Sequence, residues 1–229
     1  MLKAIIFDCD GVIANTEPLH MAAFQRVLRE RGIDLSADEY YRDYLAHDDR
    51  GCFEKALSRG AFDATPDLIS GMIALKASYL LPVMQEQLEV FAGVREFVAD
   101  VSSRLPIAIA SGALRHEVKL ILECAGIAER FIAVVAAEDV KRGKPDPEAF
   151  LEALGRINAA VSGEIKAKEA LVIEDSIPGV KAAKAAGMRC LAVTNTYPGD
   201  RLTQADIVVN TLEGLNVTRI EGMLGCAEC

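Results

Sequence analysis

The sequence predicts an α/β protein in which a doubly wound parallel sheet carries an inserted helical domain. Short, continuously apolar segments alternate with helical patterns, which is typical of parallel strands covered on both faces. Acidic or hydroxyl side chains follow directly after several of these segments. One connection, from Asp10 to Ile107, breaks the alternation, because residues 15–87 show helical patterns and no convincing strand.

Six segments have the length and apolar character of buried strands. They are Lys3–Asp8, Ile107–Ser111, Ala133–Ala136, Ala170–Glu174, Cys190–Asn195 and Ile207–Asn210. Helical patterns with apolar residues three or four positions apart lie between most of them, for example over Arg115–Ala125 and Pro147–Ile157. Small residues predict another helix over Val180–Ala186. Because ligands bind at the carboxyl ends of the strands in such sheets, we expect the functional site at this edge.

Four helices are predicted in the long connection: Pro18–Arg31, Ala37–Leu45, Arg50–Arg59 and Asp67–Gln85. Ser36 and Thr65 stand where N-caps are expected. We therefore expect a helical cap domain over 15–87 and an α/β core formed by 1–14 and 88–229. An insertion directly after the first strand would lie over the carboxyl edge of the sheet, where a lid over an active site belongs.

Composition excludes several classes of partner. The 229 residues include 25 basic and 34 acidic side chains, a net charge of -9, which argues against binding to nucleic acid or to an anionic membrane. No apolar run approaches the roughly 18 residues that span a bilayer. Asp8 comes too early for the core of a signal peptide. We expect a cytoplasmic protein, a monomer or weak dimer, that acts on small molecules.

The six cysteines are mostly scattered through apolar surroundings, as buried and reduced thiols are. Cys226 and Cys229 have the spacing of a metal-binding pair, but they stand at the extreme C-terminus without a second pair. Zinc would need two further ligands, and the three histidines suggest none. We interpret the Cys226–Cys229 pair as a tail without function.

The first motif is Asp8-Cys9-Asp10-Gly11, at the end of the first strand. Side chains two apart in a strand point the same way, so Asp8 and Asp10 can share one site. Two like charges this close repel each other unless a cation or a shared proton lies with them. Gly11 lets the chain turn sharply after the pair. The alternative is an ordinary Asp-Gly junction between a strand and a turn.

Two further segments carry groups that can bind an anion. Ser111 ends the second strand, and Gly112 lets the backbone come close to a ligand. Lys144 stands between Gly143 and Pro145, and the proline fixes the backbone just after it. The alternatives are a turn serine and a solvated basic loop.

Glu174 and Asp175 follow another apolar strand and form the fourth segment. Mg²⁺ prefers one or two carboxylates together with water and a substrate phosphate, and Asp8 with Asp175 would supply that set. The alternative is that Asp175 or Ser176 only caps the helix that follows.

Together the four segments resemble the haloacid dehalogenase superfamily, and most closely its subgroup with a helical cap, which includes β-phosphoglucomutase and phosphoglycolate phosphatase. The segments that match its patterns are Phe7–Ile13, Thr16–His20, Gly143–Pro145 and Val172–Ser176. Asn15 departs from the aspartate often found before Ser/Thr-Glu. True dehalogenases of this superfamily lack the second acid of the first motif, so Asp10 argues for phosphate chemistry.

The resemblance implies a Rossmann-like core, an aspartyl-phosphate mechanism and dependence on Mg²⁺. Asp8 would attack phosphorus, and Asp10 would serve as general acid and base. Ser111 and Lys144 would bind the phosphoryl group. The metal would be held by Asp8, Asp10, Glu174 and Asp175, with Glu174 as a ligand or as support for the ligands.

The resemblance also implies a small phosphate ester as substrate. The residues expected to bind it are Gly11, Glu17, His20, Arg50 and Gly112. For Arg50 an exposed helix arginine is the alternative. The cap has Asp48-Asp49-Arg50-Gly51 instead of the Gly-x-Ser-Arg of β-phosphoglucomutase. We therefore favour hydrolysis of a sugar or other metabolite phosphate, with a phosphomutase as the alternative.

Two other classes fit the sequence less well. A receiver domain also combines aspartate, Mg²⁺, Ser/Thr and lysine on a doubly wound sheet. It has no helical insertion, however, and its phosphorylated aspartate lies on a later strand than its acidic pair. A dinucleotide-binding protein would need a glycine-rich turn after the first strand, which Gly11 alone does not make.

Overall fold

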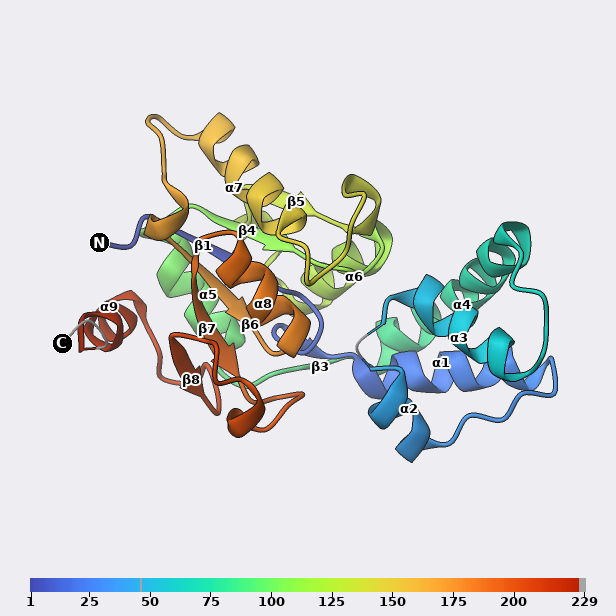
Figure 1. Cartoon of the computed structure of the whole chain (residues 1–229). Helices are drawn as coiled ribbons and strands as arrows, with labels where there is room; N and C mark the ends of the chain where they lie inside the picture. Colours follow the sequence, from blue (N-terminus) through green and yellow to red (C-terminus); the bar gives the residue numbers. More distant parts are fainter. Residues whose placement is uncertain (46, 227–229) are drawn as a thin grey trace. The chain divides into compact units, whose positions relative to one another are not determined.

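The structure is a computed structural model that describes residues 1–45 and 47–226. The chain forms two compact units (Figure 1). The α/β unit comprises Met1–Asn15 and Glu89–Cys229, and the helical unit comprises Thr16–Leu88. The predicted insertion, 15–87, differs from the helical unit by one residue at each end.

The α/β unit contains a six-stranded parallel sheet with the order β5-β4-β1-β6-β7-β8. Its strands are β1 (Ala4–Phe7), β4 (Ile107–Ala110), β5 (Ala133–Val135), β6 (Ala170–Glu174), β7 (Arg189–Val193) and β8 (Ile207–Val209). The predicted α/β fold class and its six strands are confirmed. β1 lies between β4 and β6, so its carboxyl end is at the middle of the edge where the site was expected.

The helices of this unit are α5 (Val94–Ser102), α6 (Arg115–Ala125), α7 (Glu148–Ala160), α8 (Ile177–Ala185) and α9 (Val217–Cys226). Short 3-10 turns occupy Ala128–Arg130, Ala137–Asp139, Ala167–Glu169 and Gly199–Arg201. The helix predicted over Val180–Ala186, with Ile177-Pro178-Gly179 as its start, is α8, and Ser176 caps it by accepting the N–H of Gly179 at 3.1 Å.

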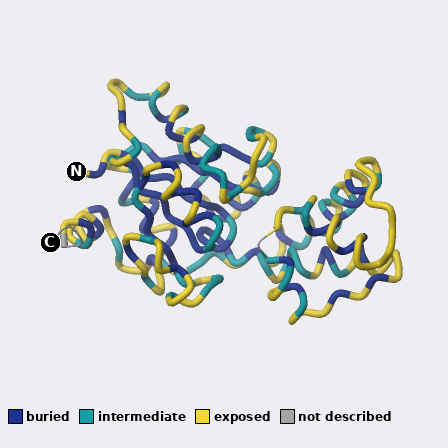
Figure 2. Tube along the Cα trace, viewed as in Figure 1, coloured by how far each residue is buried: buried dark blue, intermediate teal, exposed yellow. Residues whose placement is uncertain are grey.

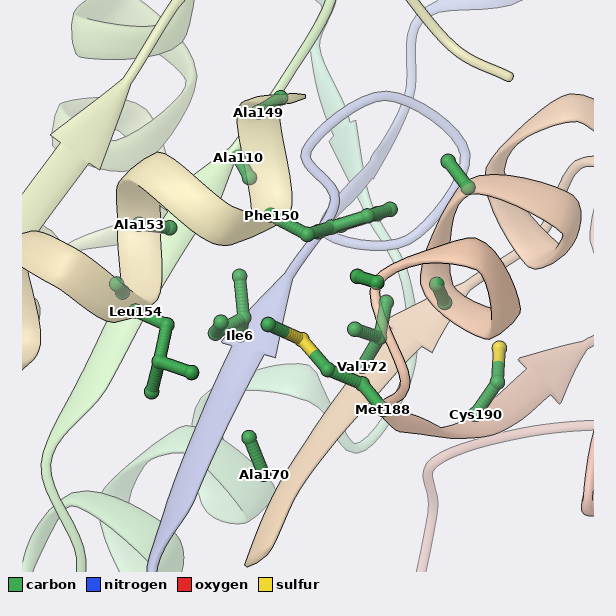
Figure 3. Packing of buried hydrophobic residues seen from close by; sticks show 14 of the residues in the cluster. Ile6, Ala110, Ala149, Phe150, Ala153, Leu154, Ala170, Val172, Met188 and Cys190 are labelled. Carbon is green, nitrogen blue, oxygen red and sulfur yellow. The ribbon is translucent and has the colours of Figure 1, made fainter. Parts of the chain in front are cut away.

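Helices cover both faces of the sheet because alternate side chains of a buried strand point to opposite sides. Ile6 lies in a hydrophobic cluster with Phe150 and Ala153 of α7 and with residues of α8 (Figure 3). Phe7 points to the other face, where its ring meets those of Phe97 and Phe131 edge-on, at centroid distances of 5.8 and 5.7 Å. The central strands β1, β4, β6 and β7 are almost continuously buried (Figure 2).

A two-stranded antiparallel pair, β2 (Ala14–Asn15) and β3 (Glu89–Val90), joins the two places where the chain leaves and re-enters the α/β unit. The sequence did not predict it, because strands of two residues are too short to show a periodic pattern. The pair brings the ends of the long insertion together.

The helical unit consists of α1 (Glu17–Arg29), α2 (Ala37–Asp43), α3 (Asp49–Arg59) and α4 (Pro66–Gln87). The predicted caps are present: Ser36 accepts the N–H of Glu39 at 3.2 Å, and Thr65 that of Leu68 at 3.3 Å. The unit has its own core, which includes Phe24, Phe53, Leu57, Ile69 and Met72.

Helix α4 corrects one expectation from the sequence. Its 22 residues are long and apolar enough, by length and composition alone, to cross a membrane. Its charged residues Asp67, Lys76 and Glu86 interrupt the apolar residues, so the sequence shows no unbroken apolar run of this length. Its buried residues pack in the helical unit beside α1 and α3, as in the core helix of a bundle, and we interpret α4 in this way.

Candidate active site

Three charged side chains meet at the carboxyl edge of the sheet. Asp8 follows β1, Glu174 is the last residue of β6, and Lys144 lies on the loop before α7. Lys144 Nζ is 2.8 Å from Asp8 Oδ1 and 2.6 Å from Glu174 Oε1. The lysine side chain is 12% exposed and the glutamate 0%. Lys144 is therefore a buried member of the site, and the solvated basic loop is excluded as its explanation.

Glu174 is held by the start of α8. Its Oε2 accepts the N–H groups of Asp175 and Ser176 at 2.8 and 2.7 Å and the Ser176 hydroxyl at 2.9 Å. A Cβ at Gly179 would overlap the carboxylate, so the glycine makes room for it. Both oxygens of Glu174 already have partners, which favours the role of an anchor for Lys144.

Asp175 lies against the turn of the first motif. Gly11 has a φ of +73°, and a Cβ there would overlap Asp175 Oδ2. The same Oδ2 accepts the hydroxyl of Thr196, from the loop after β7. In that loop, Asn195 Nδ2 donates to the Gly11 carbonyl at 2.8 Å. Gly11 thus permits the close approach of a carboxylate in addition to the turn.

Asp8, Glu174 and Asp175 form a buried acidic group that could hold a metal ion. Each can offer an oxygen, and these oxygens lie within 4.8 Å of one another. Carboxylate oxygens are the ligands that hard cations such as Mg²⁺ prefer. Lys144 supplies one positive charge against three carboxylates, so a divalent cation would relieve the remaining repulsion. The side chain of Asp10 is not part of this acidic group.

Burial and the neighbouring charges shift the pKa values of these three carboxyl groups. Burial raises the pKa of Asp8 to about 7, although the ammonium of Lys144 works against the rise. Burial also raises the pKa of Asp175 well above its usual value, and the charges of Glu174 and Asp8 add to it. Burial acts in the same direction on Glu174, but Lys144 and the backbone donors outweigh it and lower the pKa. A bound cation would favour the ionised form of all three carboxyls.

Ser111 and Asp10 lie together at the end of β4. The Ser111 hydroxyl accepts the N–H of Ala113 at 3.0 Å and donates to Asp10 Oδ2 at 3.3 Å. Ser111 is buried, whereas Gly112 is exposed. The α/β unit therefore brings the four motif segments together at the carboxyl edge of its sheet.

Comparisons with known proteins agree with this geometry. The family model for haloacid dehalogenase-like hydrolases matches residues 5–193. A phosphorylated carbohydrates phosphatase from Thermotoga maritima is 31% identical over 223 residues, which cover 95% of this chain and 99% of that relative. The chain belongs to the haloacid dehalogenase-like hydrolases. It is an enzyme of the phosphatase and hydrolase type that this family comprises.

Two solved structures have the same fold. β-Phosphoglucomutase from Clostridium difficile superposes with a TM-score of 0.85 at 23% identity, over 98% of both chains. A variant of CbbY from Rhodobacter sphaeroides, in complex with xylulose-1,5-bisphosphate, superposes with a TM-score of 0.84 at 24% identity, over 95% of this chain and 98% of that one.

The remaining predicted residues lie in the helical unit. Glu17 Oε2 accepts the Tyr40 hydroxyl at 2.8 Å. Arg50 is exposed, and its Nη1 lies 3.9 Å from Oε1 of Glu54, one helical turn further along α3. His20 Nδ1 is 2.8 Å from Lys76 Nζ, a fully buried lysine that also pairs with Asp49. The site roles of Glu17, His20 and Arg50 stay predictions.

Two features were not predicted from the sequence: the contacts of Asn195 and Thr196 at the edge of the α/β unit, and the pairing of Asp49 with Lys76. Asn195 and Thr196 follow an apolar strand, the same signal that singled out Ser111, so the sequence could have indicated them. Lys76 lies in a predicted helix, where a solvated helix face is the ordinary explanation for a lysine; that explanation is wrong, because its side chain is 0% exposed. Cys229 lies outside the described residues, as does the side chain of Cys226.

Proposed function

We propose that this hydrolase is a Mg²⁺-dependent phosphatase that removes the phosphoryl group from a small phosphorylated carbohydrate through an aspartyl-phosphate on Asp8. The observation that carries the proposal is the buried group of Asp8, Glu174 and Asp175 around Lys144, at the edge where ligands bind in such sheets.

In the first step, an oxygen of Asp8 forms a bond to phosphorus while the bond from phosphorus to the ester oxygen breaks. Asp10 gives a proton to that leaving oxygen. In the second step, water attacks phosphorus, Asp10 takes its proton, and the bond from Asp8 to phosphorus breaks. The hydroxyl of Ser111 is 3.3 Å from Asp10 Oδ2 and supports the orientation of this carboxylate.

The positive charge of Lys144 reduces the repulsion between the anionic nucleophile and an anionic substrate. At an effective dielectric constant near 20, two unit charges about 4 Å apart interact by roughly 4 kcal/mol. The ammonium offsets one such repulsion at Asp8 and is itself kept in place by Glu174. When bound, Mg²⁺ would be held by Asp8 and Asp175, with Asp10 and Glu174 as further candidates. It would supply the positive charge that these groups and a phosphoryl group still require.

The substrate class rests on two comparisons and on composition. The Thermotoga relative acts on phosphorylated carbohydrates, and the CbbY structure contains a sugar bisphosphate. The net charge of -9 argues against a polyanionic partner such as nucleic acid.

A panel of sugar phosphates, phosphoglycolate, nucleotides and p-nitrophenyl phosphate tests the proposal, with released phosphate as the readout. We expect hydrolysis of one or more sugar phosphates with Mg²⁺, loss of activity with EDTA, and recovery when Mg²⁺ is restored. Full activity in excess chelator, or a preference for Zn²⁺, would contradict the proposal. Transfer of phosphate between two positions of one sugar without net release would favour the phosphomutase alternative.

A further inference from the structure

The loop after β7, residues 194–198, makes two hydrogen bonds to the candidate active site that the proposed mechanism does not use. Asn195 Nδ2 donates to the carbonyl of Gly11 at 2.8 Å. The hydroxyl of Thr196 donates to Oδ2 of Asp175. The two acceptors belong to the first and the last of the four motif segments, so this loop ties the segments to each other.

The Thr196 hydroxyl and the turn at Gly11 both restrict one oxygen of Asp175. Oδ2 accepts the Thr196 hydroxyl and lies so close to the α-carbon of Gly11 that a Cβ there would overlap it. The side chain of Asp175 is buried, and a carboxylate with one oxygen fixed in this way cannot rotate freely. Its second oxygen, Oδ1, takes no part in these two contacts.

The loop itself is anchored at both ends. At its start, the N–H of Thr194 donates to the carbonyl of Val209 on β8 at 3.0 Å. At its far end, the short turn Gly199–Arg201 leads to Leu202, whose side chain is buried in the hydrophobic core. A loop held to the sheet and to the core can transmit that rigidity to the groups it contacts.

We propose that Thr196 is a positioning residue that holds the Asp175 carboxylate through Oδ2, so that this carboxylate would be offered to a divalent cation in one fixed orientation. The inference rests on the proposed function, because it assigns Asp175 to the metal. Three carboxylates crowd this site, and a hydroxyl that donates to one of them relieves part of their repulsion without adding charge. Groups that orient a ligand in this way typically change metal affinity when they are removed.

The test compares Thr196→Val, which removes the hydroxyl at nearly constant shape, with Thr196→Ser, which keeps it. Thr194→Val is the matched control, because the Thr194 hydroxyl donates to Oδ1 of Asn210 at 3.2 Å, in an exposed hydrogen bond outside the acidic group. Mn²⁺ binding is measured by electron paramagnetic resonance, and Mg²⁺ binding by competition with Mn²⁺. We expect Thr196→Val to bind the cation about 10–100-fold more weakly than the wild type. Thr196→Ser and Thr194→Val should bind it nearly as the wild type does.

A second readout separates positioning from a general structural role. Thr196→Val should need more Mg²⁺ for half-maximal hydrolysis of p-nitrophenyl phosphate, while its kcat at saturating Mg²⁺ returns toward the wild-type value. If Thr196→Val does not fold, Thr196→Ser carries the test, and weak metal binding by a folded Thr196→Ser would contradict the inference. Equal affinity of Thr196→Val and the wild type would overturn the inference alone. A wild-type protein that binds neither cation would overturn the proposed function as well.

Discussion

Each unit of this protein buries one lysine beside carboxylates, but the two lysines differ in charge balance. Lys144, in the α/β unit, pairs with Asp8 and Glu174 and lies near Asp175, and its ammonium is 4.9 Å from the centroid of Phe150. Lys76, in the helical unit, is 0% exposed, pairs with Asp49, contacts His20, and lies 4.5 Å from the centroid of Phe24. The first environment has an excess of negative charge, whereas in the second the lysine and one carboxylate balance.

This difference separates a site from a structural pair. A balanced pair needs no further ion, but removal of one partner leaves the other charge buried and uncompensated. An acidic cluster with one lysine keeps an excess of negative charge, which a bound cation would relieve. We therefore expect changes at Lys144 to act on turnover and changes at Lys76 to act on folding.

The largest effect is expected for Asp8→Asn, because an amide cannot attack phosphorus as a carboxylate does. Turnover should fall by about 10⁴-fold or more, as it does when a nucleophile is removed. The midpoint of thermal unfolding should not fall, because the substitution removes one of three crowded carboxylates. Steady-state phosphate release and circular dichroism measure the two quantities, and a lower midpoint would show that the charge of Asp8 supports the fold.

Lys144→Met should have the second largest effect on activity. It removes the positive charge beside Asp8, and we expect kcat/KM to fall by about 10²–10³-fold, the usual cost of losing one electrostatic contact to the transferring group. Lys141→Met, an exposed lysine on the same loop, is the control and should leave kcat/KM unchanged. A loss of similar size in both variants would mean that the loop, and not the ammonium, is responsible.

Lys76→Met should act on stability instead. The substitution leaves the carboxylate of Asp49 without its partner, and the free energy of unfolding should fall by about 3 kcal/mol, as when a buried pair is broken. The double variant Lys76→Met/Asp49→Asn removes both charges and should recover much of that loss. Urea unfolding of the three proteins gives the values. Lys76→Met with the stability of the wild type would show that the two lysines do not differ as proposed.

Arg50→Ala should have the smallest effect and tests whether the helical unit selects the substrate. The four motif segments serve only the phosphoryl group, so discrimination must come from groups that touch the leaving part. Loss of a charged hydrogen bond would lower kcat/KM for the preferred sugar phosphate by about 1–3 kcal/mol of transition-state stabilisation. Hydrolysis of p-nitrophenyl phosphate should change far less. Equal loss on both substrates would assign Arg50 to the phosphoryl group, and no loss would make it an ordinary surface residue.

The α/β core could be predicted from the sequence because its strands are continuously apolar and end in polar residues. Asp8 and Glu174 were found in this way, since short motifs mark strand ends directly, whereas Lys144 was found from the glycine and proline on either side of it. Thr196 follows a strand as Ser111 does, so its position could have been noticed, but its contact with Asp175 could not be predicted because it exists only once β6 and β7 lie side by side. The burial of Lys76 was missed for the same reason, since helix packing decides it.

The central claim, covalent catalysis by Asp8, is tested most directly by trapping the intermediate. Wild-type enzyme is mixed with a rapidly hydrolysed substrate and Mg²⁺, quenched in acid within the first turnover, digested, and analysed by mass spectrometry. Asp8→Asn and a sample quenched before addition of substrate are the controls. We predict a phosphorylated peptide that contains Asp8 in the wild type and in neither control. An active wild-type enzyme without this peptide, or a phosphorylated peptide in Asp8→Asn, would contradict the account.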